Sequence, residues 1–138
     1  MTNVQSVLRI KRPDRGVILT AVILVLIYAL VFVLEQILSN ALKYTKSGSI
    51  HIYLSPDAPK TLVIEDTGIG IRPEDVPRVF EKGFTGYNGR EENRSTGIGL
   101  YLCGKIMKRL DHGIRIESEL GKGTKVFLEL GRKKMDLY

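Results

Sequence analysis

The chain has 138 residues, of which 43% are hydrophobic and 26% charged, and its formal net charge is +6. This length suits one domain, and this composition is that of a globular protein that builds its core without disulfides. Cys103 is the only cysteine in the sequence. Its apolar neighbours predict a buried structural thiol and not a nucleophile. The positive charges are scattered and no basic run is interleaved with aromatic residues, which argues against nucleic-acid binding.

Residues 16–34 carry no charge and are almost wholly aliphatic, a pattern typical of a membrane-spanning helix. A span that ends at Val31, before the polar segment, would be only about 24 Å long, which is thin for a bilayer core. We therefore favour a soluble interpretation, with a membrane segment and an altered segment as the alternatives. In the soluble interpretation, the chain begins with a strand at residues 4–10, a turn at 13–16 and a strand at 17–20. A long buried helix follows at 22–45 and ends at a glycine cap, Gly48.

The rest of the chain alternates between strand-like and helical patterns. Strands are expected at residues 49–54, 61–65, 113–118 and 124–130, the first two and the last two forming hairpins. A short helix is expected to open at Pro73, and a longer one covers residues 97–110. Residues 83–95 show no pattern and predict a functional lid or a disordered loop. This order predicts a two-layer α/β sandwich, in which helices cover one face of an antiparallel or mixed sheet.

Asp66 stands at the end of an expected strand and is followed by Gly68 and Gly70. A buried carboxylate there could accept a hydrogen bond from an exocyclic amine, and the glycines would let a flat ligand approach the main chain. A plain strand-to-helix turn explains the same residues equally well.

Residues 95–100 open a helix with two glycines, Gly97 and Gly99. Free backbone N–H groups and the helix dipole favour phosphate at such an end. The segment fits neither a dinucleotide-binding fingerprint nor a P-loop, and a simple capped helix is as good an explanation.

Gln36, Asn40 and Lys43 lie four and three residues apart, so they share one face of the long helix. An asparagine oxygen can ligate Mg²⁺ beside phosphate oxygens, and Lys43 provides a compact positive charge. The alternative is a polar stripe on a surface helix. Farther along, Phe80 and Phe84 lie at the edge of the lid, where they could anchor it by burial or be ordinary core residues.

In this order and spacing, the four segments together resemble the GHKL ATPase superfamily, and specifically its histidine kinase branch. They are similar to the N box (residues 32–45), the first glycine box (65–71), the F box (79–85) and the second glycine box (96–100). Residues 36–45, QILSNALKYT, are nearest to kinases of the small, peptide-antibiotic-sensing type. The resemblance implies an atypical apolar segment at 1–31, a catalytic ATP-binding domain with a Bergerat fold at 32–131, and a basic tail at 132–138.

The resemblance also implies roles for individual residues. Asp66 would accept from the adenine amino group, Asn40 would hold Mg²⁺, Lys43 would approach the phosphates, and the amides of the second glycine box would meet them. Gln36 stands where hydrolysing relatives have a glutamate, which favours phosphoryl transfer over hydrolysis; Glu35 should point elsewhere. The expected catalytic residues are Gln36, Asn40 and Lys43; the expected nucleotide contacts are Asn40, Lys43, Tyr44, Asp66, Gly68, Gly70, Ile71, Phe84, Thr85, Thr96, Gly97, Ile98, Gly99, Leu100 and Thr124.

A complete histidine kinase needs a phosphoacceptor histidine on a dimerising helix. Only His51 and His112 occur here, and neither has that context, so we interpret both as structural. The implied function is a protein-histidine kinase module that binds ATP and Mg²⁺ and acts on a separate dimerisation domain, indirectly serving a response regulator. It would be the cytoplasmic part of a membrane-bound kinase, reaching the membrane only through the parent protein. A serine kinase of the same superfamily and a membrane-anchored binding module are the alternatives.

The same resemblance provides a second argument against a membrane span. Lys11, Arg12 and Arg15 would hold the amino terminus in the cytoplasm. A single span would then place the ATP-using domain outside the cell, where there is no ATP.

Overall fold

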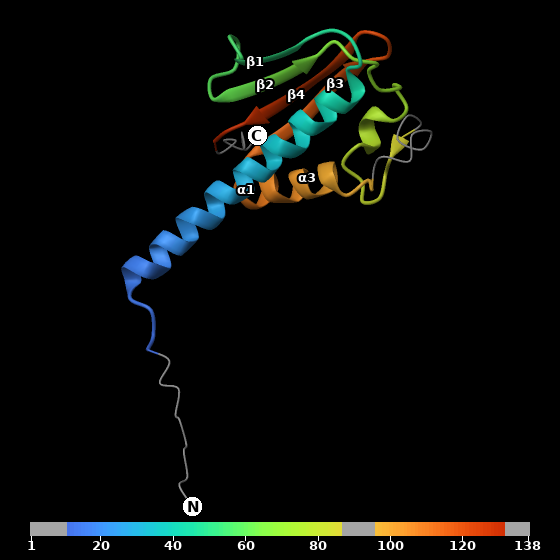
Figure 1. Cartoon of the computed structure of the whole chain (residues 1–138). Helices are drawn as coiled ribbons and strands as arrows, with labels where there is room; N and C mark the ends of the chain where they lie inside the picture. The colour runs from blue at the N-terminus through green and yellow to red at the C-terminus, as the bar shows by residue number, and fades with distance from the viewer. Residues whose placement is uncertain (1–10, 87–95, 132–138) are drawn as a thin grey trace, which may run out of the picture.

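A computed structural model describes residues 11–86 and 96–131. Within these ranges the chain forms one sheet with helices on one of its faces (Figure 1). The expected strand at 4–10, the tail at 132–138 and most of the lid lie outside the described residues. The elements in chain order are α1 (Arg15–Tyr44), β1 (Ile50–Leu54), β2 (Thr61–Asp66), the 3-10 helix η1 (Val76–Arg78), α3 (Gly99–Arg109), β3 (Gly113–Glu119) and β4 (Gly123–Glu129).

The four strands pair in the order β1-β2-β4-β3, and each pairing is antiparallel. Both predicted hairpins are present, because β1 pairs with β2 and β3 with β4. The β2–β4 register sets Asp66 opposite Thr124. Two residues that are far apart in sequence therefore meet at one end of the sheet, and the predicted two-layer α/β sandwich is confirmed.

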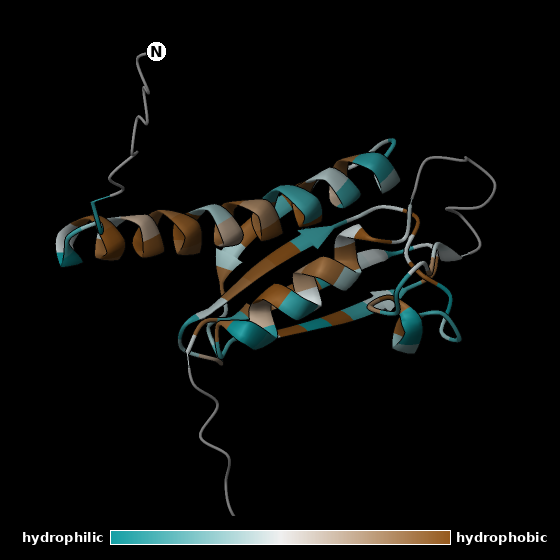
Figure 2. Cartoon of the chain, turned by 90° about the horizontal axis from the view of Figure 1, so that it is seen from below, coloured by the Kyte–Doolittle hydropathy of each residue, from teal (hydrophilic) through white to brown (hydrophobic). Residues whose placement is uncertain are grey.

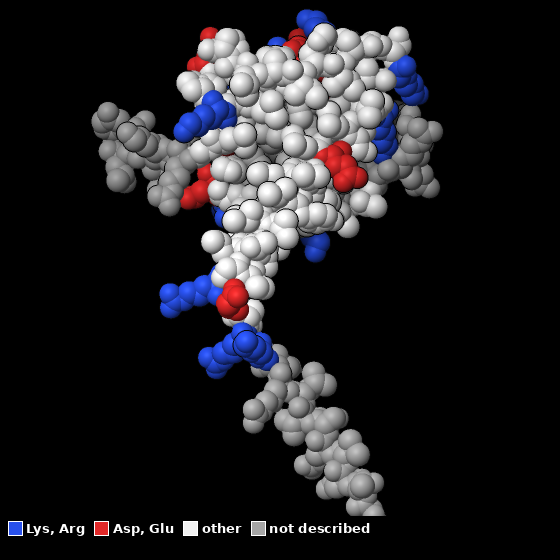
Figure 3. All heavy atoms as spheres, turned by 60° about the vertical axis from the view of Figure 1, so that its left-hand side comes forward, with Lys and Arg blue, Asp and Glu red and all other residues white. Residues whose placement is uncertain are grey.

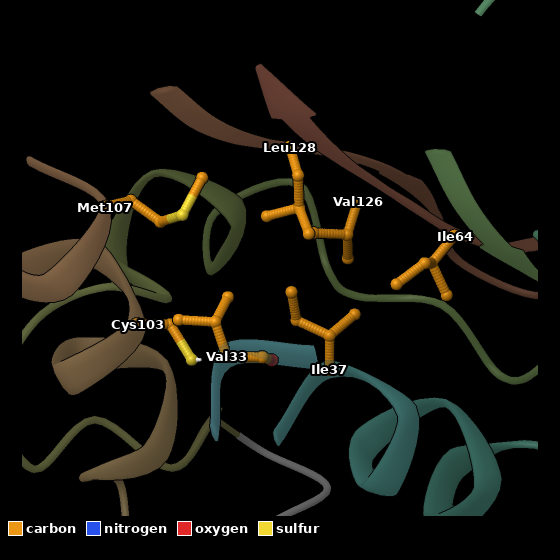
Figure 4. Packing of buried hydrophobic residues seen from close by; sticks show 7 residues of the cluster. All are labelled: Val33, Ile37, Ile64, Cys103, Met107, Val126 and Leu128. Carbon is orange, nitrogen blue, oxygen red and sulfur yellow. Dashed lines mark hydrogen bonds between the residues drawn. The ribbon is translucent and has the colours of Figure 1, made fainter. Parts of the chain in front are cut away.

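The core lies between the sheet and the two helices (Figure 4). Val33 and Ile37 of α1 and Cys103 and Met107 of α3 pack together over strand residues of β2 and β4, namely Ile64, Val126 and Leu128. Cys103 is fully buried, as predicted, and burial raises the pKa of its thiol to about 11. The core thereby fixes the carboxyl-terminal half of α1 over the sheet.

The predicted strand at residues 17–20 is wrong, because α1 already begins at Arg15. Asp14 caps the helix: its Oδ1 accepts a hydrogen bond from the N–H of Val17 at 2.8 Å. β-branched residues in this segment favoured a strand. A helix nevertheless pairs its own backbone groups without a neighbouring strand, and the apolar sequence continues it without interruption to Tyr44.

The expectation of a buried helix is also wrong for the amino-terminal half of α1. Every residue from 15 to 28 is exposed, and the buried residues of α1 are Val33, Ile37 and Ala41. This half extends beyond the sheet and α3 (Figures 1 and 2). α1 is long and apolar enough to cross a membrane, and only 6% of its most apolar window is buried.

Two local predictions need smaller corrections. The helix expected at Pro73 is a 3-10 turn at Val76–Arg78. Gly48 is not the cap of α1: Thr45 occupies the C-cap position, and Gly48 turns the chain toward β1 at a φ of 135°. The strand expected at residues 49–54 is present as the edge strand β1, and its apolar residue Ile52 is 55% exposed.

Candidate functional site

A cavity of about 270 Å³ lies between the carboxyl-terminal half of α1, the ends of β2 and β4, and the start of α3. Its volume is close to the lower limit of about 300 Å³ for small-molecule sites. All the residues predicted for the site line it except Gly68 and Ile98. The predicted residues that line it are Gln36, Asn40, Lys43, Tyr44, Asp66, Gly70, Ile71, Phe84, Thr85, Thr96, Gly97, Gly99, Leu100 and Thr124.

The cavity also contains residues that the sequence analysis did not select. Two are charged, Arg72 and Asp75, and they come just after the first glycine box; their position between that box and the lid was the available signal. The others include core residues such as Ile37, Ile64 and Val126. Their hydrophobic periodicity predicts burial alone, so no sequence signal distinguished a cavity wall from the rest of the core.

Asp66 is the buried acid of the cavity, with 9% of its surface exposed. Burial raises the pKa of its carboxyl group, while the nearby backbone of Gly68 and Thr124 and the hydroxyl of Thr45 oppose this rise. The N–H of Gly68 donates to Oδ1 at 2.9 Å. A carboxylate that has lost much of its water but still opens on a cavity is suited to accept a hydrogen bond from a ligand.

Thr45 lies beside this carboxylate at the end of α1. Its Oγ1 is buried and completes no hydrogen bond within the described part of the chain, although its proximity favours the ionised form of Asp66. The geometry at Gly68 explains the crowding: a Cβ there would lie 2.7 Å from Thr45 Oγ1 and 2.8 Å from Asp66 Oδ1. Only glycine leaves space for both oxygens.

The loop after Asp66 is held from two sides. The N–H of Ile69 donates to the carbonyl of Tyr44 at 3.1 Å, and the N–H of Ile71 donates to Oγ of Ser118 at 2.8 Å. Between them, Gly70 has a φ of 70°, and a Cβ at Gly70 would collide with the backbone carbonyl of Glu119. The loop therefore has a fixed position relative to α1 and to the β3–β4 hairpin, as a preformed site requires.

The polar face predicted on α1 opens on the cavity. Gln36, Asn40 and Lys43 all line it, and the side-chain oxygen of Gln36 lies so close to Gly99 that a Cβ there would clash with it. Glu35 lies on the outer side of α1, in a groove with Leu38 and Leu42. The structure thus agrees with the expectation that Glu35 points elsewhere.

The start of α3 forms the opposite end of the cavity. Ile98 occupies the N-cap position without a side-chain cap hydrogen bond, so the first N–H groups of α3 have no partner from that side chain. Gly97 has a φ of 67°, and a Cβ there would clash with Gly83. Helix N-termini of this kind bind anions.

Both ends of the predicted lid are anchored. The N–H of Gly83 donates to the carbonyl of Gly97 at 2.9 Å, which joins the two ends of the segment. Phe84 packs under the guanidinium of Arg78, 4.6 Å from the ring centroid, and lines the cavity. Phe80 lies 3.5 Å from the position of a Cβ on Gly104 of α3. Both aromatic residues therefore pack at the base of the lid, and Phe84 also contributes to the site.

Neither histidine belongs to the cavity. His51 lies on β1, where Nε2 and Oγ of Ser49 are 2.9 Å apart. His112 follows α3 and accepts a hydrogen bond from the N–H of Gly131 at 3.1 Å. Across residues 11–86 and 96–131 there is also no group of three or more His, Cys, Asp or Glu side chains able to hold a metal ion.

A family model described as "Histidine kinase-, DNA gyrase B-, and HSP90-like ATPase" matches residues 27–134. The sensor protein BceS of Bacillus subtilis (strain 168) is 44% identical over 96 residues, covering 69% of this chain and 29% of BceS. The sensor histidine kinase GraS of Staphylococcus haemolyticus (strain JCSC1435) is 46% identical over 92 residues, covering 66% of this chain and 27% of GraS. The chain thus spans less than a third of the length of these relatives.

Two solved structures share the fold. The mycobacterial sensor histidine kinase MprB superposes with a TM-score of 0.61 at 24% identity, covering 73% of this chain and 68% of that one. Full-length ShkA, in complex with AMPPNP, superposes with a TM-score of 0.59 at 22% identity, covering 72% and 20%.

Proposed function

Because the chain belongs to the histidine kinase-, DNA gyrase B- and HSP90-like ATPase family, we propose that it is the catalytic ATP-binding domain of a sensor histidine kinase. It positions the γ-phosphate of ATP for transfer to a histidine on a separate dimerisation domain. The observation that carries this proposal is that a buried acid, Asp66, and the uncapped start of α3 at Gly99 line the same cavity. The carboxylate of Asp66 suits an amine, and the free N–H groups at the start of α3 suit a phosphate.

The adenine base lies at the Asp66 end of the cavity. Its amino group donates to the Asp66 carboxylate, and Gly70 and Ile71 form the adjacent wall. Because Gly68 already donates to Oδ1, the carboxylate is oriented before the base arrives. Tyr44 borders the nucleoside, and Thr124 stands opposite Asp66 in the β2–β4 register.

The triphosphate extends toward the start of α3. Lys43 offers a positive charge on the α1 side, and the backbone N–H groups around Gly97 and Gly99 offer donors on the other. Phe84, Thr85, Thr96 and Leu100 complete the walls at the base of the lid.

The residues present fit a magnesium ion that is held chiefly by the nucleotide. Mg²⁺ keeps several waters and takes few protein ligands when it binds with phosphates. Asn40 lines the cavity, and an amide oxygen is the kind of hard ligand this ion prefers. Bound there, the ion would neutralise charge on the phosphate oxygens.

Gln36 favours transfer over hydrolysis. An amide cannot remove a proton from water at neutral pH, and Glu35 on the outer side of α1 lies away from the cavity. The role of this chain is therefore to hold and orient the nucleotide and to stabilise charge on it, which is most of what phosphoryl transfer requires from a protein.

A histidine acceptor is favoured over a serine acceptor, because the similar protein GraS is named a sensor histidine kinase. His51 and His112 lie outside the cavity, on β1 and after α3. We infer that the acceptor belongs to a dimerisation domain of the parent kinase, and that this domain passes the phosphate to a response regulator in the cytoplasm.

Calorimetric titration with ATP and Mg²⁺ tests the proposal. Wild-type chain should bind saturably, Asp66→Asn and Asn40→Ala should each weaken binding by about tenfold or more, and Glu35→Gln, outside the cavity, should bind like the wild type. Absence of saturable binding by folded wild-type chain contradicts the proposal.

Transfer itself is tested by mixing the chain and ATP with the separately purified dimerisation domain of a similar sensor kinase. Acid-labile phosphate on that domain is expected. Acid-stable phosphate would instead indicate a serine kinase.

A further inference from the structure

The amino-terminal half of α1, residues 15–28, is here named the apolar arm. Its large apolar side chains are 42% (Leu26) to 73% (Tyr28) exposed. The nucleotide cavity does not use it, because the first residue of α1 to line that cavity is Gln36. A continuous exposed apolar surface of this kind marks contact with a partner or a membrane.

The apolar arm is apolar all the way round. The six consecutive residues 22–27 are each large, apolar and at least 42% exposed. Since successive residues point about 100° apart, six of them cover the whole circumference of the helix. A second copy of α1 would cover only one stripe of each helix, whereas lipid covers every side.

The polar groups of the apolar arm are already satisfied or lie at its ends. The hydroxyl of Thr20 donates to the carbonyl of Gly16 at 2.9 Å, as an apolar surrounding requires. Figure 3 shows basic side chains and one acidic side chain at the far end of the arm, where the sequence has Lys11, Arg12, Asp14 and Arg15, so these charges lie outside the uncharged stretch. Tyr28 lies near the base, and tyrosine is common at membrane–water interfaces.

The length available for a span is set by the first buried residue of α1, Val33. Residues 16–32, the apolar arm and the turn that follows it, extend about 26 Å as a helix, which is at the short end of the range of about 17–25 residues for a membrane-spanning helix. Local thinning of the bilayer and the outward reach of Arg15 would close the difference from a hydrocarbon core of about 30 Å. An orientation in the plane of the membrane would need a polar face, which the arm lacks.

We propose that the apolar arm spans a lipid bilayer and holds the nucleotide-binding domain directly at the membrane surface, without a linker. With the cavity in the cytoplasm, Lys11, Arg12 and Arg15 cross to the far side, against the usual distribution of cationic residues. Insertion therefore depends on the hydrophobicity of the arm and not on its flanking charges. This proposal does not depend on the nucleotide chemistry, so the two can fail separately.

The sequence contains no tryptophan, so one introduced tryptophan reports its own surroundings. Leu24→Trp, near the middle of the uncharged stretch, is reconstituted in phosphatidylcholine–phosphatidylglycerol vesicles. We expect blue-shifted emission that lipids brominated deep in their acyl chains quench most strongly. Leu54→Trp, at a site 69% exposed on edge strand β1, should keep water-like, unquenched emission.

A charge in the apolar arm provides the second test. Leu24→Arg should lower the fraction of chain that floats with vesicles by roughly 100-fold, while Leu54→Arg should leave it unchanged; thermal unfolding followed by circular dichroism checks that both variants fold. Water-like emission from Leu24→Trp in vesicles would overturn the proposal. So would a blue shift without lipid in a chain that light scattering shows to be oligomeric, since copies of the chain would then cover the arm.

Discussion

Oδ1 of Asp66 accepts a hydrogen bond from the backbone N–H of Gly68 at 2.9 Å. This contact joins the end of β2 to the loop that borders the cavity, and it holds a buried carboxylate in one orientation. Burial still has the larger effect, because the pKa of Asp66 is raised overall. The acid is therefore set up for a ligand at some cost to the stability of the empty protein.

Asp66→Asn is expected to separate these two effects. A group with a raised pKa in the folded state stabilises the fold most at low pH, and this contribution is lost as pH rises through the raised pKa. At pH 7 the neutral amide should therefore raise the urea midpoint of the nucleotide-free chain, while ATP affinity falls by about tenfold or more. Urea denaturation and calorimetry on the same samples measure both, and a drop in both would contradict the expected trade-off.

The pH dependence of ATP binding should reflect the same carboxyl group. Protonation removes the charge that accepts from the amino group, so affinity should fall as pH drops through the raised pKa, at a higher pH than for an ordinary aspartate. Thr45→Val removes a hydroxyl that lowers this pKa, so the fall should move to still higher pH. Asp66→Asn lacks this component and serves as the control for titration of the phosphates; an unshifted profile in Thr45→Val would contradict the role of the hydroxyl.

Much of the site could be predicted because its chemistry lies in short segments. Asp66, Gly70 and Asn40 belong to segments that are each compatible with a simple turn or a surface helix but whose order and spacing together resemble a known family, and the structure gathers them around one cavity. Arg72 was missed because its only signal was its position between the first glycine box and the lid, and that position was not used. The apolar wall, such as Ile64, was missed because periodicity reports burial and not what lies next to it.

The amino-terminal half of α1 shows where local pattern fails. Residues 17–20 have strand propensity, but no described strand lies beside them, and propensity is easily overridden when a helix can pair its own backbone. The exposure of this half of α1 could not be predicted either. A wholly apolar segment implies burial somewhere, but the sequence does not say whether the surroundings are protein or lipid.

Two glycines with similar backbone angles provide a matched test of the loop. Gly70 and Gly121 have φ values of 70° and 84°, so alanine at either position costs about 1–2 kcal/mol of unfolding free energy. At Gly121 a Cβ meets nothing within 4 Å, whereas at Gly70 it collides with the backbone of Glu119. Gly70→Ala should therefore lose about 3 kcal/mol or more, measured by urea denaturation. Equal losses for the two variants would show that the loop yields.

Cys103 should report unfolding of the α1–α3 contact. Its side chain is fully buried, its pKa is raised to about 11 by burial, and its Sγ lies 4.0 Å from the carbonyl of Val33. A thiol reagent at pH 8 needs both access and thiolate, so native chain should react far more slowly than chain in urea.

The consequence of this burial for stability can be tested by two small substitutions at the same position. Cys103→Ala leaves a small cavity and should cost about 1 kcal/mol. Cys103→Ser buries a hydroxyl, and the Val33 carbonyl that the thiol contacts at 4.0 Å is too far for a normal hydrogen bond to oxygen, so this variant should cost more, about 1–3 kcal/mol. Val33 lies between the apolar arm and the nucleotide face of α1. If Cys103→Ser loosens this contact, a protease should cleave α1 near Val33 faster in the serine variant than in the alanine variant. Limited proteolysis of both variants and the wild type measures these differences, and rates equal to the wild type in both variants would show that the helix contact does not depend on Cys103.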